Sequence, residues 1–264
     1  AVPAFVLSGA DRVEPREEVF DAFDERSAAH DHFECWAFAY AKDVITRNND
    51  RVDGPPRPRG TVGAWLEDVA LKNGALAALS MAGRARPQLI PALNRTATRF
   101  GAGPVLIDRS YRIFATPRLV HFNEMEYAIP RAHLVPAARA VLELIESRGL
   151  PTNFPIELRT VAADDALMSP AGGRDTGYVA VHVYRGMDWQ RYFRAVEGIM
   201  RDLGGRPHWG KRHFRTAADL RPAYPAWDRF QAVRARLDPQ GTFTNGYVRQ
   251  VLGPVAAASV PAPA

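Results

Sequence analysis

The sequence predicts an α+β fold in which an antiparallel or mixed sheet is flanked by helices. Short segments rich in β-branched and aromatic residues alternate along the chain with longer segments of helical period. The helical segments return between strands that are not neighbours in sequence, which favours this class over a regular parallel sheet, and we expect the helices on one side. The 264 residues, 47% of them hydrophobic, suffice for one large domain or two small ones.

The first half of the chain begins with a predicted helix over residues 15–26. Pro15 suits the first helical position, acidic residues occupy the first turn, and Val19, Phe20 and Phe23 form an apolar stripe at helical spacing. The other elements expected here are strands over Phe33–Arg47, a Pro/Arg/Gly connector over Val52–Gly60, helix over Thr61–Phe100 with breaks at Pro87 and Pro91, and strand over Tyr111–Tyr127.

The second half contains the clearest helical patterns. Leu134–Arg148 carries apolar residues at helical spacing and is followed by Gly149, which is typical of a C-terminal cap. Asp188 can cap a second amphipathic helix, whose aromatic stripe predicts a core face and which stops at Gly204-Gly205. The remaining expected elements are strands over 155–161 and 177–184, a loop over Asp164–Thr176, a last helix over Ala226–Leu237 and a disordered Ala/Pro-rich tail over 254–264.

Composition argues against several classes of protein. The formal net charge of +5 comes from arginines interleaved with acids, whereas a nucleic-acid-binding protein would concentrate it in a stripe or tail, so we expect no nucleic-acid partner. No apolar run reaches the length of a membrane span, although a weakly basic face could contact an anionic ligand or a membrane surface. The single Cys35 excludes an intramolecular disulfide and fits a reducing compartment, which indicates a cytoplasmic protein with peripheral membrane association left open.

Two predicted strands place polar side chains on one face. Glu157 and Arg159 share a face of the first strand, and His182 and Tyr184 share a face of the second. If both strands turn their apolar faces to the helices, these four side chains line a common polar wall. Such a wall offers a donor fork, an acceptor and an imidazole to a hydroxylated substrate. The same pattern also fits a solvated face with a Glu–Arg ion pair of little energetic value.

A lysine in a later bend has an unusual setting. Only three of the 34 basic residues are lysines, and one of them, Lys211, follows His208 and Trp209 in a Gly/Pro-rich segment. A compact ammonium is not interchangeable with a planar guanidinium, so its choice here indicates a need for a point charge. By spacing alone, Lys211 fits an ordinary surface charge equally well.

Other catalytic templates do not match the sequence. His30 and His32 lie in a polar turn without a partner cluster, so we expect no metal site. The glycines at 101–103 and 172–173 complete neither a dinucleotide fingerprint nor a phosphate loop. There is no Gly-x-Ser-x-Gly elbow, and Cys35 lacks a plausible base.

The order of the polar motifs resembles that of a known family. The motifs are Glu157-Leu158-Arg159, the strand that carries His182, the bend His208-Trp209-Gly210-Lys211 and the close Asp238-Pro239…Gly241…Phe243…Asn245. They follow one another as in the sugar-lactone oxidases: D-arabinono-1,4-lactone oxidase, L-gulono-1,4-lactone oxidase or dehydrogenase, and the alditol oxidases of the vanillyl-alcohol-oxidase flavoprotein group. Phe33–Arg47 and Asn123–Tyr127 resemble the start and middle of their substrate domain. The resemblance implies that residues 1–253 form the substrate, or cap, domain of a two-domain flavoprotein.

The resemblance also implies roles for individual residues. The Glu-x-Arg pair orients substrate hydroxyls and faces the flavin, while the lysine lies near the flavin and the reacting hydroxyl. The expected catalytic residues are Glu157, Arg159, His182 and Lys211; the expected substrate contacts are Glu157, Arg159 and Tyr184; and the expected cofactor contacts are Lys211, His208 and Asn245.

The implied reaction is hydride transfer from a carbinol carbon of an aldonolactone or polyol to N5 of FAD. The family's FAD-binding domain is not recognisable in these residues, and we expect it in the same precursor or in a separate chain. Without it, the chain should bind FAD weakly or not at all. Two alternatives stay open: a sugar- or lactone-binding module without its own redox centre, and a subunit that docks on a separate flavoprotein.

Overall fold

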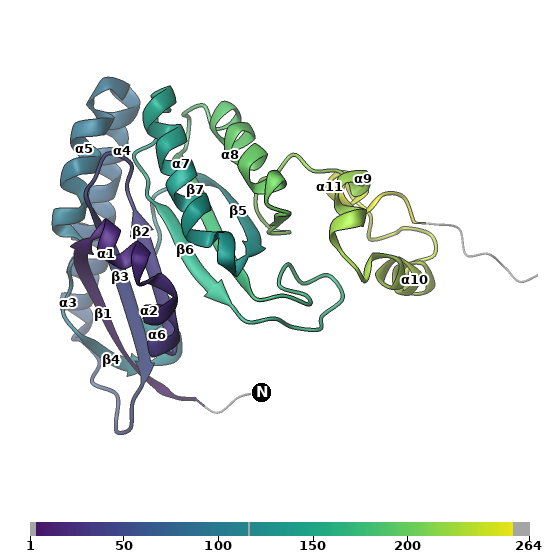
Figure 1. Ribbon diagram of the computed structural model, residues 1–264. Coiled ribbons are helices and arrows are strands. Elements are labelled where there is room, and N and C mark those ends of the chain that lie inside the picture. Colours follow the sequence, from purple (N-terminus) through teal and green to yellow (C-terminus); the bar gives the residue numbers. More distant parts are fainter. Residues whose placement is uncertain (1–3, 116, 256–264) are drawn as a thin grey trace, which may run out of the picture.

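An antiparallel sheet forms the centre of the protein in a computed structural model that describes residues 4–115 and 117–255 (Figure 1). Within these residues the spatial order of its eight strands is β4-β1-β3-β2-β6-β7-β5-β8. The strands are β1 (Val6–Pro15), β2 (His32–Ala37), β3 (Asp43–Arg51), β4 (Leu106–Arg109), β5 (Phe122–Pro130), β6 (Ile156–Val161), β7 (Thr176–Tyr184) and β8 (Arg206–Pro207). The predicted α+β class is therefore confirmed.

One face of the sheet is apolar and carries the main hydrophobic core. Val179, Val181 and Val183 alternate along β7 and are buried together with Ile145 and Phe193 from the covering helices. These helices are α1 (Arg16–Asp21), α2 (Phe23–Ala29), α7 (Leu134–Arg148) and α8 (Gln190–Asp202). Burial of each large aliphatic side chain contributes about 1.5–3 kcal/mol. Because neighbouring residues of a strand point to opposite faces, this packing directs the polar side chains of β5, β6 and β7 to the other face.

A second group of helices covers part of that other face. Its elements are α3 (Thr61–Trp65), the π-helical η1 (Leu66–Asn73), α4 (Gly74–Ala85), the 3-10 turns η2 (Pro87–Leu89) and η3 (Thr98–Phe100), α5 (Ile90–Ala97) and α6 (Ser110–Phe114). Leu76 and Leu93 of this group line a cavity together with Ile45 of β3. The expectation that helices lie on one side only is wrong, because Ile45 gives the second face an apolar end that the Ala/Leu-rich segment can cover.

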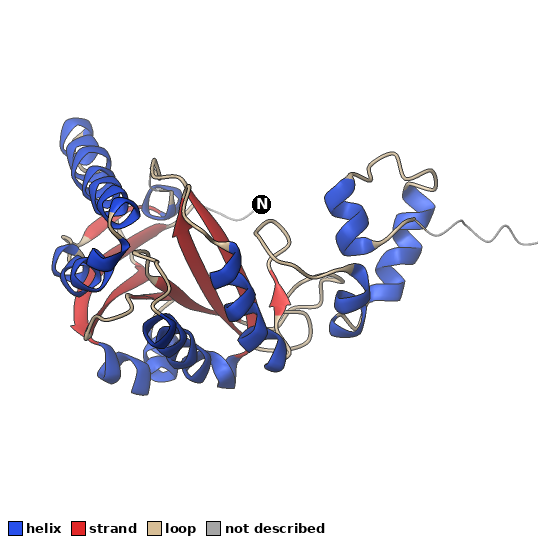
Figure 2. Cartoon of the chain, turned by 90° about the horizontal axis from the view of Figure 1, so that it is seen from above, coloured by secondary structure: helices blue, strands red, loops and turns tan. Residues whose placement is uncertain are grey.

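The last part of the chain forms a small helical projection beside the sheet (Figures 1 and 2). It consists of α9 (Ala217–Leu220), the 3-10 turn η5 (Arg221–Ala223), α10 (Trp227–Leu237) and α11 (Gly246–Leu252). Leu220, Tyr224, Trp227 and Val251 form a separate buried cluster within it. Thr216 begins α9 with a capping box to Asp219, in which each residue satisfies a backbone N–H of the other.

Several predicted elements have different boundaries in the structure. The helix expected over 15–26 is divided at Ala22 into α1 and α2. In the strand expected over Tyr111–Tyr127, Ser110–Phe114 is helix α6 and strand β5 begins only at Phe122. Pro91 does not break the helical segment, because it lies in the first turn of α5, where proline is tolerated.

In the described part of the chain, the strands β1, β4 and β8 and the helices α9 and α11 were not expected at all. β1 shows little alternation in sequence, and α11 follows the helix that we expected to be the last. The remaining boundaries agree closely: the Phe33–Arg47 segment forms β2 and most of β3, α7 ends at Gly149 with a φ of 56°, and α8 follows Asp188, whose Oδ1 accepts from Gln190 N at 3.0 Å.

The predicted tail, 254–264, falls largely outside the described residues, which end at 255. In the part of the chain that the structure describes, none of the helices combines the length and the apolar character needed to cross a membrane.

Candidate active site

Strand register brings the predicted polar residues to one face of the sheet. In the β6–β7 pair, Glu157 lies opposite Ala180 and Arg159 opposite Tyr178, so these side chains point to the same face as His182, two residues further along β7. His182 in turn lies opposite Glu124 of β5. The polar wall inferred from alternation is therefore present in the structure, on the face away from the main core.

Lys211 reaches this wall because its bend is hydrogen-bonded to β5. The backbone N–H of His208 donates to Glu126 O at 2.9 Å, and that of Arg212 donates to Glu124 O at 2.9 Å. The bend between them turns the lysine side chain over the strand, where Lys211 Nζ lies 2.6 Å from Glu124 Oε1 and 2.6 Å from Glu126 Oε2.

The cluster is a chain of alternating charges. Arg159 donates from Nη2 to Glu126 Oε1, so Glu126 binds the guanidinium with one oxygen and the ammonium of Lys211 with the other. At the far end, His182 Nε2 lies 3.2 Å from Glu124 Oε1. Glu126 is fully buried, with 0% of its side chain exposed, whereas 34% of the Arg159 side chain is exposed. The buried Glu126 therefore holds the more exposed Arg159 and Lys211 from behind, whereas Glu124 is partly exposed like Lys211.

The electrostatics of the cluster follow from these contacts. Burial raises the pKa of Glu124, but hydrogen bonds and positive charge from His182 and Lys211 outweigh it and lower the pKa to about 2. Burial likewise opposes the charge of Arg159, but the carboxylates of Glu126 and Glu157 overcompensate and raise its pKa. The cluster therefore holds its Glu124 carboxylate and Arg159 guanidinium charged at neutral pH.

Glu157 lies beside this charge chain and lines a cavity of about 290 Å³. The side chains of Trp36, His182, Phe122 and Phe154 also line the cavity. Trp36 Nε1 donates to Glu157 Oε2 at 3.3 Å. The His182 ring packs edge-on against Phe122 at 5.2 Å between centroids, and its Nδ1 lies 3.2 Å from Pro155 O. The ring is thus held between an apolar wall and the acidic residue on β5.

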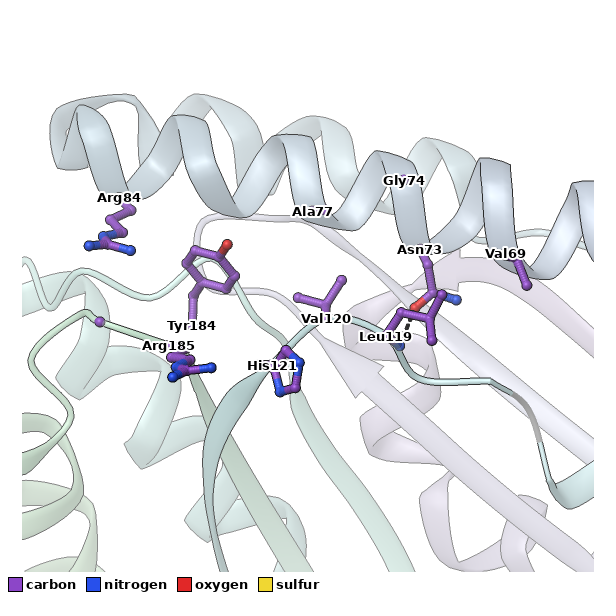
Figure 3. Close-up of a pocket in the computed structure, with 11 residues that line it drawn as sticks. Val69, Asn73, Gly74, Ala77, Arg84, Leu119, Val120, His121, Tyr184 and Arg185 are labelled. Atoms are coloured by element: carbon purple, nitrogen blue, oxygen red, sulfur yellow. Dashed lines mark hydrogen bonds between the residues drawn. The ribbon is translucent and has the colours of Figure 1, made fainter.

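The other predicted residues lie at different distances from the cluster. His208 borders it: burial, together with the positive charges of Lys211 and Arg159, lowers the pKa of its imidazole. Tyr184 does not line the cavity of Glu157 and instead faces a neighbouring cleft (Figure 3). Asn245 belongs to the helical projection, where its side-chain oxygen accepts from Val248 N at 2.8 Å and caps α11.

Sequence reasoning missed the two acids that organise the site. Glu124 and Glu126 alternate with Met125 and Tyr127, so their shared face could be read from β5 alone. Their partners could not, because the pairing of β5 with β7 and β8 joins residues that are distant in sequence. Trp36 on β2 was missed for the same reason, since it meets Glu157 only through the β2–β6 pair.

The fold and the site together define an α+β domain with a charged, partly open wall on one face of its sheet. A family model described as D-arabinono-1,4-lactone oxidase matches residues 1–251. The chain belongs to the D-arabinono-1,4-lactone oxidase family.

Curated relatives agree with this membership. The chain is 48% identical over 255 residues to an L-gulono-1,4-lactone dehydrogenase of Mycobacterium tuberculosis, covering 96% of this chain and 59% of that protein. It is 31% identical over 257 residues to L-gulonolactone oxidase of Bos taurus, covering 95% and 58%. The chain thus spans less than two thirds of the length of these relatives and matches their C-terminal part.

Solved structures share the fold at low sequence identity. A solvent-stable cholesterol oxidase gives a TM-score of 0.69 at 16% identity, covering 96% of this chain and 61% of that one. Cholesterol oxidase from Brevibacterium sterolicum gives 0.66 at 18% identity, covering 95% and 60%.

Proposed function

We propose that residues 1–253 form the substrate domain of an FAD-dependent oxidoreductase that oxidises an aldonolactone of the arabinono- or gulono-1,4-lactone type. The observation that carries the proposal is the convergence of Arg159, Lys211 and His182 on one wall beside the cavity of Glu157, held there by Glu124 and Glu126. The names of the relatives supply the substrate class, because lactone dehydrogenases and oxidases match almost the whole chain.

An FAD-binding domain is the partner that this proposal requires. The chain spans only 59% of its mycobacterial relative, which leaves room in that protein for a further domain. The wall also fits the cofactor chemically. Among the described residues, Arg159 Nε is a buried donor without a hydrogen-bond partner, and Lys211 adds a positive charge close by. A flavin presents acceptor atoms along one edge of its ring, and Lys211 and Arg159, with His208 beside them, are the residues that would face it.

FAD, when bound, would supply the electron acceptor for a hydride from the carbinol carbon, and the hydroxyl proton would be lost to a nearby base or water. The residues of this chain position and polarise the substrate. Lys211 places an ammonium where negative charge develops on the reacting oxygen, which is electrostatic stabilisation of the transition state. Arg159 donates to a neighbouring hydroxyl, and Glu157 accepts from another.

Glu157 is suited to this acceptor role by its own contacts. Trp36 occupies Oε2, and among the described residues no donor is bound to Oε1. His182 lines the same cavity. It is the remaining polar group that could contact the hydroxylated ring of the proposed substrate. Orientation by fixed groups of this kind lowers the barrier by removing alternative poses of the substrate.

The experiment is stopped-flow reduction of the flavin by aldonolactones, using the complete gene product that carries this chain. We expect Lys211→Met to slow flavin reduction by two orders of magnitude or more, consistent with loss of one preorganised charge contact to a developing oxyanion. Lys42→Met is the matched control, because Lys42 is an exposed lysine away from the wall. Equal reduction rates in wild type and Lys211→Met, with both folded, would overturn the role of Lys211. Lactone binding without any flavin reduction in the wild type would instead indicate a binding module.

A further inference from the structure

A second cleft, of about 600 Å³, lies next to the cavity of Glu157 (Figure 3). The helical segment of η1 and α4 forms its roof, and the chain around the start of β5 and the end of β7 forms its floor. Tyr184 projects into it from the same face of β7 as His182, two residues away. Asn73 and Val120 line both spaces, so the two are contiguous.

Three basic side chains surround this cleft. Arg84 extends down from α4, and Arg185 and His121 lie below it (Figure 3). Within the described ranges, none of these three side chains makes a hydrogen bond or an ion pair, and none of the described side chains lining the cleft is acidic. This differs from the active-site wall, where Arg159 and Lys211 are both bound to carboxylates. Two guanidinium charges with no acidic side chain among the described lining residues create a positive potential that favours an anion.

The backbone brings these residues together at the cleft. Arg185 N donates to His121 O at 3.0 Å, which joins the two basic residues of the floor. Gly186 has a φ of 87°, which favours glycine, and the Arg84 guanidinium lies against it: a Cβ there would be 2.9 Å from Arg84 Cζ, and this flexible side-chain end would have to shift. Asn73 braces the adjoining wall, donating to Pro117 O at 2.9 Å and accepting from Leu119 N at 2.8 Å.

We propose that this cleft binds a compact oxyanion, a carboxylate or a phosphate monoester, carried by a small hydroxylated molecule. The two guanidinium groups can each bind such a group through paired N–H donors. Tyr184 adds a hydroxyl between Arg84 and Val120 (Figure 3). The ring-opened acid of a sugar lactone and a sugar phosphate both have this chemistry, whereas the closed lactone is neutral. The proposal depends on the charges of the cleft and not on flavin chemistry.

Calorimetric titration of the complete protein tests the site without turnover. The ligands are inorganic phosphate, arabinose 5-phosphate, L-gulonate and neutral L-gulono-1,4-lactone. We expect the anions to bind to the wild type, and we expect Arg84→Ala/Arg185→Ala to weaken their binding at least tenfold. Lactone binding should change less than twofold. Comparison of the phosphate and carboxylate ligands then identifies which anion the cleft prefers.

The control is Arg148→Ala/Arg229→Ala, which removes the same charge from exposed positions on α7 and α10. Equal weakening in the control would show non-specific attraction and overturn the proposal, as would absence of anion binding by the wild type. Arg84→Lys/Arg185→Lys is a second variant in case the alanine variant does not fold. It keeps both positive charges but loses the paired N–H donors of the guanidinium groups, so we expect an anion affinity between those of wild type and the alanine variant. Flavin reduction by lactone can succeed or fail independently of all these results.

Discussion

Glu126 is the residue that joins the two cations of the proposed active site. Its two carboxylate oxygens bind different partners, Arg159 and Lys211, and its side chain is fully buried. A buried carboxylate with two charged donors is stable only while both remain, because the uncompensated charges would otherwise stay in a poorly solvated place. Glu126 therefore sets the distance between the Arg159 guanidinium and the Lys211 ammonium. A ligand that binds both groups must match this distance.

Glu126→Gln should affect stability and catalysis together. Removing one partner of a buried ion pair costs about 3–5 kcal/mol, and the shape of glutamine should keep the loss near the lower figure. Flavin reduction should also slow, since Arg159 and Lys211 lose their common anchor. Denaturant unfolding and stopped-flow reduction measure the two effects. Glu18→Gln, on the exposed side of α1, is the control and should change the unfolding free energy by less than about 0.5 kcal/mol. A variant as stable and as fast as wild type would contradict the bridging role.

Glu124 makes the stability of the site depend on acid pH. Its pKa falls from 4.5 to about 2 in the folded protein, so the folded state binds fewer protons than the unfolded state between these values. The resulting stabilisation, on the order of 3 kcal/mol, is complete above pH 4.5 and disappears as the pH falls towards 2. Urea unfolding should show wild type more stable than Glu124→Gln at pH 6, with the difference shrinking towards pH 3. A pH-independent difference would argue against the assignment.

At this scale, the sequence was sufficient for residues whose signal is local. Alternation along β6 and β7 placed Glu157, Arg159 and His182 on one face, and the scarcity of lysine drew attention to Lys211. The sequence was insufficient for Glu126, because the role of this carboxylate depends on partners that lie on other strands. The roles of all these residues in catalysis stay predictions until the variants are measured.

At the scale of elements, helices with strong amphipathic patterns were predicted well, whereas elements that depend on tertiary contacts were not. α7 and α8 carry long apolar stripes with clear stop signals, and both form close to the expected boundaries. β1 was missed because it is an interior strand with polar residues on both faces, held by pairing with β3 and β4 rather than by its own pattern. The π-helical η1 likewise has no signature in sequence, although it helps to roof the basic cleft.

The cap of α11 shows how a residue expected at the cofactor can have a structural task. Asn245 accepts from Val248 N, which satisfies one of the free N–H groups of the first turn. We expect Asn245→Ala to destabilise the protein by about 1 kcal/mol, and Asn245→Asp to stay within a few tenths of wild type, since both Asn and Asp are good caps. Thermal unfolding measures this. If Asn245 also contacts the flavin domain, as the sequence suggested, Asn245→Asp will alter flavin reduction despite unchanged stability.

At the scale of the whole molecule, the two faces of the sheet differ: one packs the hydrophobic core and the other carries the proposed functional groups. One face is closed by α1, α2, α7 and α8 and holds the main core, while the other presents the charged wall, the cavity of Glu157 and the basic cleft. The helical projection is tied to the wall through α11, because Tyr247 donates its hydroxyl to Trp209 O at 2.6 Å, two residues before Lys211. A partner that covers this open face would contact the sheet and the projection at once.

This arrangement predicts how FAD affinity should divide between the chain and its proposed partner domain. The wall offers cations and donors to one edge of a flavin, but among the described residues no phosphate loop or dinucleotide fingerprint is present for the rest of the cofactor. We therefore expect the isolated 264-residue chain to bind FAD at least a hundredfold more weakly than the complete gene product, a difference of about 2.7 kcal/mol or more. Flavin fluorescence titration measures both affinities, and circular dichroism establishes that the isolated chain is folded. Tight FAD binding by the folded chain alone would show that this domain holds the dinucleotide by itself, which is incompatible with a half-site completed by another domain.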